Sequence, residues 1–353
     1  MSPHKQFDHL RIPLEEIVSA TDNFSDANFI RYDGFGKEYK GQLLQSGRLV
    51  DIVARRLDDK NGIGIKEFWM EVSMLCTLEH QNIVSIVGFC DDGDDGEKIV
   101  INKLETRGSL CNYLTDPCLT WMRRLQICVG VARALYYIHY DEGRDFGVIH
   151  RDIKSSKILL DDNWEAKLYG FELSMNQAAA EWNCVSYNKV CGTPGYMDPT
   201  YVKTGSVSHK SDMFSFGVVL IEVLCGKVTE AVNEGEDYLY ELAKSHIENG
   251  RLYDMVNPGL WKQMDPQSFK IFSEIAYCCL KAEPSERPSI DQILIQLEKA
   301  LESQQEQENH QEKIEGATSK SLKVIDLFWD EAIVVNIISK LSLLSLGKRV
   351  SLI

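Results

Sequence analysis

Short apolar segments with strand-like patterning are concentrated in the first third of the chain. The segments 51–57, 83–90 and 98–104 alternate apolar and polar residues or run apolar, and 30–43 reads as two strands joined by a glycine-containing turn. Segments of this length and pattern are typical of β-strands. Between them, residues 66–78 repeat apolar side chains every three or four positions, which is helical spacing. The pattern predicts a β-rich first part that carries one long helix.

Helical spacing dominates the chain farther on. Apolar residues recur at helical intervals over 119–140, 209–226, 238–246, 267–280 and 290–301. The segment 209–226 is apolar on nearly every side after its first turn, which predicts a buried central helix. The second part of the domain is therefore predicted to be α-helical.

Composition narrows the function classes. The chain has 353 residues, of which 44% are hydrophobic and 26% charged, as in ordinary globular proteins. Its 38 basic and 53 acidic residues give a net charge of −15. This balance argues against a nucleic-acid partner and against general attraction to anionic membranes.

Cysteine usage and the N-terminal sequence indicate a reducing compartment. Ten cysteines are scattered without CxxC pairs, and the segment MSPHKQFDHL has no apolar signal core. Ser2 stands where myristoylation needs glycine. No stretch before residue 320 is apolar enough to span a bilayer. We expect no transmembrane segment and a cytoplasmic protein, free or peripheral at the inner face of the plasma membrane.

The sequence HRDIKSSK, which begins at His150, resembles the protein-kinase catalytic loop H-R-D-x-K-x-x-N. This resemblance implies catalytic roles for Asp152 and Lys154. Lys157, however, stands at the asparagine, and Gly170 stands at the aspartate of the D-F-G motif. In the family those two positions hold the magnesium ions that bridge the ATP phosphates. We therefore expect a kinase fold without a metal site.

The strand-turn-strand segment IRYDGFGKEYKGQL is similar to the glycine-rich loop of kinases, G-x-G-x-x-G-x-V, whose glycines let backbone amides approach phosphate. Arg31 and Asp33 replace the first two glycines, and Gly36 matches the third. Gly34 lies between Asp33 and Gly36. Glu38 stands at the valine that covers the adenine. An unpaired carboxylate there would be costly to bury. We expect a solvated hairpin with Glu38 turned outward, or an empty pocket.

Other positions of the family's ATP site follow from the same resemblance. The segment DIVARRL is similar to the V-A-x-K strand, with Val53 under the adenine and Arg55 at the lysine. Glu71 matches the glutamate that pairs with that lysine, which predicts an Arg55–Glu71 ion pair with a structural role. Leu159 is expected at the floor of the adenine slot.

The chain matches the family more closely at the positions that build the fold than at the catalytic positions. The segments ATDNF, ending at Phe24, and CGTPGYMDPTY, beginning at Cys191, resemble plant receptor-like Ser/Thr kinases. The resemblance implies that Thr193 bridges the catalytic-loop aspartate and lysine, and that Asp212 anchors the loop backbone. The family's glutamate partner for Arg287 is replaced by threonine, so Arg287 needs another partner. An apolar column joining the two lobes is expected from Leu75, Ile86, His150 and Phe171.

The resemblance implies an α+β, bilobal kinase-like fold. We expect an N-terminal extension over 1–28 and a kinase-like domain over 29–303, with a small β-rich lobe to residue 105 and a large α-helical lobe from 106. Residues 304–353 are predicted to form a polar Gln/Glu linker and a tail.

Three functional readings remain open at this point. The first is a pseudokinase that acts as a signalling scaffold or regulator of other protein kinases, receptor complexes or their substrates, with no cofactor. The second is a weak Ser/Thr kinase, which would need ATP and Mg²⁺. The third is a metal-independent nucleotide sensor in which Arg55 and Lys157 neutralise phosphate.

Overall fold

The computed structural model describes residues 5–45, 47–57, 64–92, 96–140, 146–178, 185–186, 190–229, 238–311 and 313. The chain divides into two units, Met1–Leu301 and Glu302–Ile353. The predicted tail beyond residue 313 lies outside the described residues. The site is built within the first unit.

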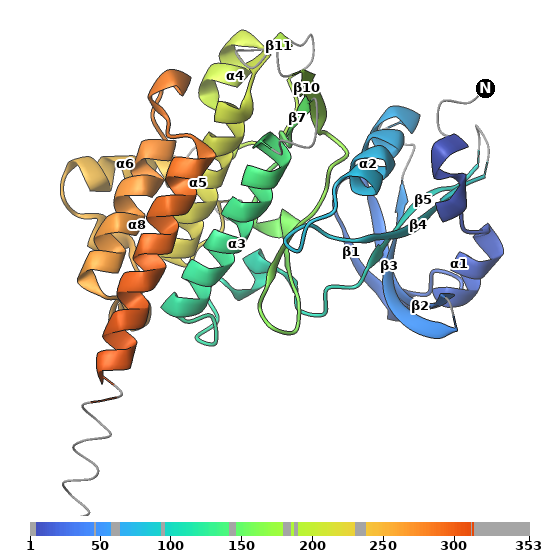
Figure 1. Cartoon of the computed structure of the whole chain (residues 1–353), viewed down its shortest axis with the longest axis horizontal. Coiled ribbons are helices and arrows are strands. Elements are labelled where there is room, and N and C mark those ends of the chain that lie inside the picture. Colours follow the sequence, from blue (N-terminus) through green and yellow to red (C-terminus); the bar gives the residue numbers. More distant parts are fainter. Residues whose placement is uncertain are drawn as a thin grey trace, which may run out of the picture. The chain divides into compact units, whose positions relative to one another are not determined.

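A five-stranded antiparallel sheet forms the first part of this unit, in the order β1-β2-β3-β5-β4 (Figure 1). Its strands are β1 (Phe29–Tyr32), β2 (Gly36–Gln45), β3 (Arg48–Leu57), β4 (Ile86–Asp91) and β5 (Lys98–Lys103). Helix α2 (Ile65–Thr77) contacts β4 and β5, and α1 (Leu14–Ala20) contacts β2. Two 3₁₀ turns, Lys5–Leu10 and Asp26–Asn28, flank α1.

Helix α2 is placed by the apolar face that its sequence predicts. Phe68, Val72 and Leu75 are buried in the main core cluster. Burying such side chains is worth roughly 1.5–3 kcal/mol each, which fixes the face that the helix turns to the sheet. Glu71 lies on the same helix and is also buried. The packing therefore carries a carboxylate into the interior.

The second part is mainly helical. It contains α3 (Trp121–Tyr140), α4 (Pro199–Thr204), α5 (His209–Cys225), α6 (Leu239–Glu248), α7 (Pro258–Trp261), α8 (Pro266–Cys279) and a helix that begins at residue 290. Short 3₁₀ helices span Leu110–Tyr113, Ser155–Lys157, Leu252–Met255 and Pro284–Glu286. Helix α5 is buried along almost its whole length and packs against α8, α6 and α3.

Small sheets order the loops of the second part. Strand β8 (Ile158–Leu160) pairs with β6 (Gly108–Ser109) and β9 (Ala166–Leu168). Strand β7 (Phe146–Ile149) pairs with β10 (Met175–Ala178), and β11 (Val185–Ser186) pairs with β12 (Ser206–Val207). The catalytic-loop sequence therefore lies between two anchored strands, β7 and β8.

The predicted bilobal kinase-like fold is confirmed, with element ends shifted by a few residues. The rings of His150 and Phe171 lie 4.8 Å apart, and Leu75 is buried in the same core as Phe171, as the predicted column requires. Residues 304–311, the start of the predicted Gln/Glu linker, are helical. Within the described residues, no helix is long and apolar enough to cross a membrane.

Candidate functional site

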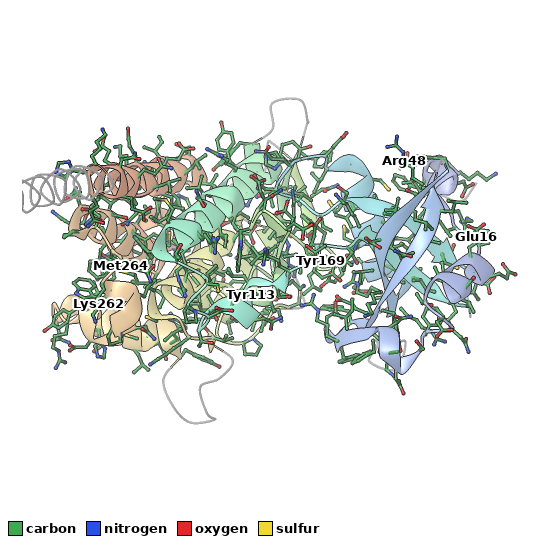
Figure 2. The ribbon with its side chains drawn as sticks, turned by 90° about the horizontal axis from the view of Figure 1, so that it is seen from below. Glu16, Arg48, Tyr113, Tyr169, Lys262 and Met264 are labelled. Atoms are coloured by element: carbon green, nitrogen blue, oxygen red, sulfur yellow. The ribbon has the colours of Figure 1, made fainter. Side chains whose placement is uncertain are left out.

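A cleft of about 520 Å³ opens between the strand-rich and helical parts. Tyr169, which lies where the two parts meet, lines it (Figure 2). The predicted positions Val53, Lys154, Lys157 and Leu159 line it too. Its other lining residues are Ile30, Arg31, Tyr32, Asp33, Glu38, Leu104, Glu105, Gly108, Ser109, Cys111, Asn112 and Ser156. This volume falls in the range of small-molecule sites.

The loop from Asp33 to Gly36 is tied into the site. The Asp33 carboxylate accepts hydrogen bonds from the backbone N–H groups of Phe35 and Gly36, both at 2.9 Å, and its other oxygen lies 3.0 Å from Arg55 Nη1. Gly34 takes a φ of +87°, which glycine adopts without strain. The expectation of a freely solvated hairpin is wrong, because the loop aspartate pairs with a buried arginine.

Glu38 also departs from expectation, because it is buried and paired. Its carboxylate lies 2.8 Å from Arg31 Nε and accepts a hydrogen bond of 2.7 Å from the Tyr169 hydroxyl. The strand register explains the first contact, since Arg31 and Glu38 face each other across β1 and β2. Burial raises the pKa of Tyr169 well above its usual value, so this side chain stays a hydroxyl donor.

Arg31 reaches from the small sheet to the helical part. Beyond Glu38, its Nη1 donates to the carbonyl of Ser156 at 3.1 Å and contacts the Ser109 hydroxyl. Burial would lower the pKa of this guanidinium, but Glu38, Tyr169 and Asp33 together outweigh burial and the pKa is raised. A residue at a glycine position of the family motif therefore fastens the loop to the opposite wall.

Arg55 is fully buried and contacts three carboxylates. Its guanidinium pairs with Glu71, as predicted, and Nη1 lies 3.0 Å from Asp33 and 3.3 Å from Glu172. Its cationic carbon lies 5.5 Å from the centroid of the Tyr169 ring. A planar guanidinium can serve several acceptors at once, which an ammonium group does less well. Arg55 thus joins Asp33, Glu71 and Glu172 in one buried cluster of ion pairs.

Lys157 forms a second buried cluster of ion pairs, with Asp152 and Glu172. Its Nζ lies 2.5 Å from Asp152, pairs with Glu172 and donates to the carbonyl of Gly170 at 3.4 Å. Burial would lower the pKa of Lys157, yet the two carboxylates raise it to about 12. Burial would raise the pKa of Asp152 and Glu172, but Lys157 and further cations hold each at about 2. All three groups are ionised near neutrality.

Gly170 and Lys157 fit together sterically. Gly170 takes a φ of +85°, and a Cβ placed on it would lie 2.7 Å from Cδ and 3.0 Å from Nζ of Lys157. The lysine side chain therefore runs through the space beside this glycine. The two residues that replace the family's metal ligands are complementary to each other.

Contacts behind the catalytic loop follow the resemblance. Asp212 accepts hydrogen bonds from the backbone N–H groups of His150 at 2.8 Å and Arg151 at 2.9 Å. The Thr193 hydroxyl donates to Asp152 at 2.7 Å. The Asp212 contacts fix the loop on α5, and the Thr193 contact orients the Asp152 carboxylate.

The partner that Arg287 was predicted to need is Asp198. Two guanidinium nitrogens lie 2.7 Å from the two Asp198 oxygens, and both side chains are buried. A bidentate pair of this kind is strong and directional. The threonine at position 200 instead donates to the carbonyl of Ala282 at 3.0 Å.

The residues present do not fit a magnesium site of the family type. A hard cation needs oxygen ligands, whereas Gly170 offers no side chain and Lys157 offers an ammonium group. The nearby carboxylates Asp152 and Glu172 are already paired with Lys157. Among the described residues, no group of three or more His, Cys, Asp and Glu could hold a metal ion.

Sequence reasoning missed how the charged residues pair. It did not include Glu172, Tyr169, Asp33 or Glu38 among the site residues as partners of the cations. One signal was available, because Glu172 and Lys157 are opposite charges at two substituted positions of the same family site. A paired charge substitution of that kind indicates mutual contact.

Comparison with known families agrees with this geometry. The family model for the protein kinase domain matches residues 34–297, so the chain belongs to the protein kinase family. Among curated proteins of Arabidopsis thaliana, it is similar to the receptor-like protein kinases ANXUR2 (37% identical over 300 residues), HERK 1 (37% over 305) and FERONIA (35% over 300). Each alignment covers 84% of this chain and 33–35% of the relative. The chain therefore spans about a third of the length of the curated relatives it matches.

Proposed function

We propose that this kinase domain is a pseudokinase that acts in signalling as a scaffold or allosteric regulator of other protein kinases, receptor complexes or their substrates. One observation carries the proposal: Lys157 pairs with Asp152 and Glu172 in the region where the family binds metal. Phosphoryl transfer depends mostly on electrostatic stabilisation by metal ions and phosphate contacts. Because Lys157, Asp152 and Glu172 are already paired with one another, Asp152 cannot by itself drive phosphoryl transfer.

The regulatory role is supported by the way the domain is held together. Arg55 joins α2, through Glu71, to Glu172 beside the catalytic loop. The His150–Phe171 contact keeps the column between the lobes closed. A domain whose two parts are joined by its own side chains presents a defined surface, which suits a binding module.

A weak Ser/Thr kinase is the second candidate, and one contact favours it. The Thr193 hydroxyl donates to Asp152 at 2.7 Å, the arrangement expected for orienting a substrate hydroxyl. The contact also fixes the loop structurally, so it supports either function. The metal-independent nucleotide sensor is less well supported, because Arg55 and Lys157 are already paired with carboxylates.

A thermal-shift titration with ATP, with and without Mg²⁺, separates these candidates. The pseudokinase proposal predicts no additional stabilisation when Mg²⁺ accompanies ATP, because the protein supplies no metal ligands. A weak kinase predicts Mg²⁺-dependent stabilisation. A shift of several degrees that requires both ATP and Mg²⁺ would overturn the proposal.

A further inference from the structure

The turn that follows β8 places the Trp164 ring beside two arginines. The guanidinium carbons of Arg107 and Arg123 lie 4.3 and 4.9 Å from the centroid of this ring. The Tyr113 ring packs edge-on against it at 5.2 Å, and the Tyr113 hydroxyl donates to the carbonyl of Arg107 at 2.9 Å. Trp164 takes a φ of +66°, which is uncommon for a residue other than glycine. Cation–π contacts of this kind hold a guanidinium in place without a carboxylate.

The two arginines have no carboxylate partner among the described residues. Arg107 donates from Nε and Nη2 to the backbone carbonyl of Asp162 at 3.3 and 3.2 Å, and Arg123 donates from Nη1 to the carbonyl of Cys118 at 2.7 Å. The Asp162 carboxylate instead accepts from the Thr106 hydroxyl at 2.5 Å. Each guanidinium therefore keeps N–H groups with no acceptor in the part of the chain that the structure describes. Two such groups suit a phosphate, which accepts several charge-assisted hydrogen bonds.

A cavity of about 270 Å³ adjoins the arginine pair along α3. Trp164 lines it, and so does Gln126, which lies one helical turn from Arg123 and therefore on the same face of the helix. The buried Asn82 side chain lines it too. Its Nδ2 donates to the carbonyl of Ala166 at 2.9 Å, whereas its Oδ1 has no donor among the described residues. A buried acceptor left open in a cavity suits a ligand with N–H groups, such as a peptide backbone.

We infer that this surface binds a segment of a partner protein that carries a phosphoserine or phosphothreonine. Arg107 and Arg123 hold the phosphate, whose charge of nearly −2 matches two guanidinium groups, and the cavity beside Trp164 takes the adjoining backbone. The net charge of −15 favours such a compact anion over a nucleic acid or an anionic membrane. The inference deepens the proposed scaffold role, on which it rests, by naming a class of partner. The surface is separate from the cleft, because none of these residues lines the cleft.

The test is fluorescence anisotropy of the full chain with a labelled degenerate peptide library centred on a fixed phosphoserine. The same library centred on serine is titrated beside it. We expect the phosphoserine library to bind at least about tenfold more tightly, because serine offers no charge to the two arginines. Equal binding of the two libraries would overturn the inference. Tighter binding to vesicles of phosphatidylcholine and phosphatidylserine than to the phosphoserine library would also overturn it, in favour of a membrane partner.

Single arginine variants locate the site. Arg123→Gln should weaken binding of the phosphoserine library by about tenfold. Arg48→Gln is the matched control, because it removes the same charge from an exposed position at the start of β3 and should change little. If Arg123→Gln does not fold, Arg123→Lys replaces it and should still weaken binding several-fold, since lysine lacks the planar fork. Equal losses from the variants at positions 123 and 48 would show that net charge alone matters and would contradict the inference.

Phosphate incorporation from labelled Mg²⁺-ATP, measured on the same samples, keeps this inference distinguishable from the proposed function. Incorporation that depends on Asp152 would overturn the pseudokinase proposal and leave the phosphopeptide surface standing, because Arg107 and Arg123 do not line the cleft. Loss of the preference for phosphoserine, with no incorporation, would overturn only the phosphopeptide surface.

Discussion

The two sides of the catalytic loop use buried charge in different ways. Behind the loop, Asp212 and Thr193 make the contacts that the family resemblance implies, and each fixes backbone or orientation. In front of it, Lys157 and Arg55 pair with carboxylates from three other segments. The contacts that build the fold are thus present, while the cations in front of the loop are paired with carboxylates of the same chain.

The largest effect is expected from the buried Arg287–Asp198 pair in the helical part. Arg287→Ala should lower the free energy of unfolding by about 3–5 kcal/mol, because it leaves the buried Asp198 carboxylate without its bidentate partner. Urea denaturation followed by circular dichroism measures the change. A loss below about 1 kcal/mol would show that this pair contributes less to stability than its burial suggests.

Glu172→Gln should have an intermediate effect in front of the loop, roughly 1–3 kcal/mol, since Arg55 and Lys157 keep other carboxylate partners. The pKa of Glu172 is depressed from 4.5 to about 2, so its stabilising contribution is present above pH 4.5 and is lost as the pH falls toward 2. The variant should therefore lose less stability than the native protein over that range.

Glu222→Gln is the control for that pH series. Burial raises the pKa of Glu222 to about 7, and no cation pairs with it among the described residues. Its contribution has the opposite sign, because stability falls as the pH rises from 4.5 toward 7. Glu222→Gln should therefore leave unchanged the loss of stability that occurs as the pH falls from 4.5 toward 2. If both variants altered the same pH range, the assignment to Glu172 would be wrong.

A smaller and more specific effect concerns Gly170 and Lys157. Gly170→Asp should be destabilising by about 1–3 kcal/mol from backbone strain and contact with Lys157, and Lys157→Asn should relieve the contact. The double-mutant cycle should show a coupling of about 0.5–3 kcal/mol. Gly34→Asp is a matched control, because Gly34 has nearly the same φ and a Cβ placed on it would meet no atom within 4 Å. Coupling of Gly34→Asp to Lys157→Asn would contradict the steric account.

The smallest effect provides the baseline. Arg133 and Glu298 form an exposed ion pair at 2.8 Å in the helical part. Arg133→Ala should change the free energy of unfolding by less than about 1 kcal/mol, and added salt should reduce the difference further. A loss as large as that of Glu172→Gln would mean that burial does not distinguish these pairs.

The sequence predicted the features that depend on a local residue pattern or on alignment with a family motif. Asp212, the Thr193–Asp152 half of the predicted bridge and the Arg55–Glu71 pair lie where the motifs place them. The partners of Glu38, Arg287 and Glu172 were not predicted, because each pairing depends on segments brought together only in the folded chain. Glu38 illustrates the reason: its burial looked too costly only while its pairing with Arg31 and Tyr169 was unknown.

The most direct test of the central claim is phosphate transfer from labelled Mg²⁺-ATP, to the chain itself and to a generic Ser/Thr substrate. The native protein is compared with Asp152→Ala. Because glycine and a paired lysine occupy the metal-ligand positions, we predict no incorporation above that of the variant. Incorporation by the native protein that disappears in Asp152→Ala would contradict the account.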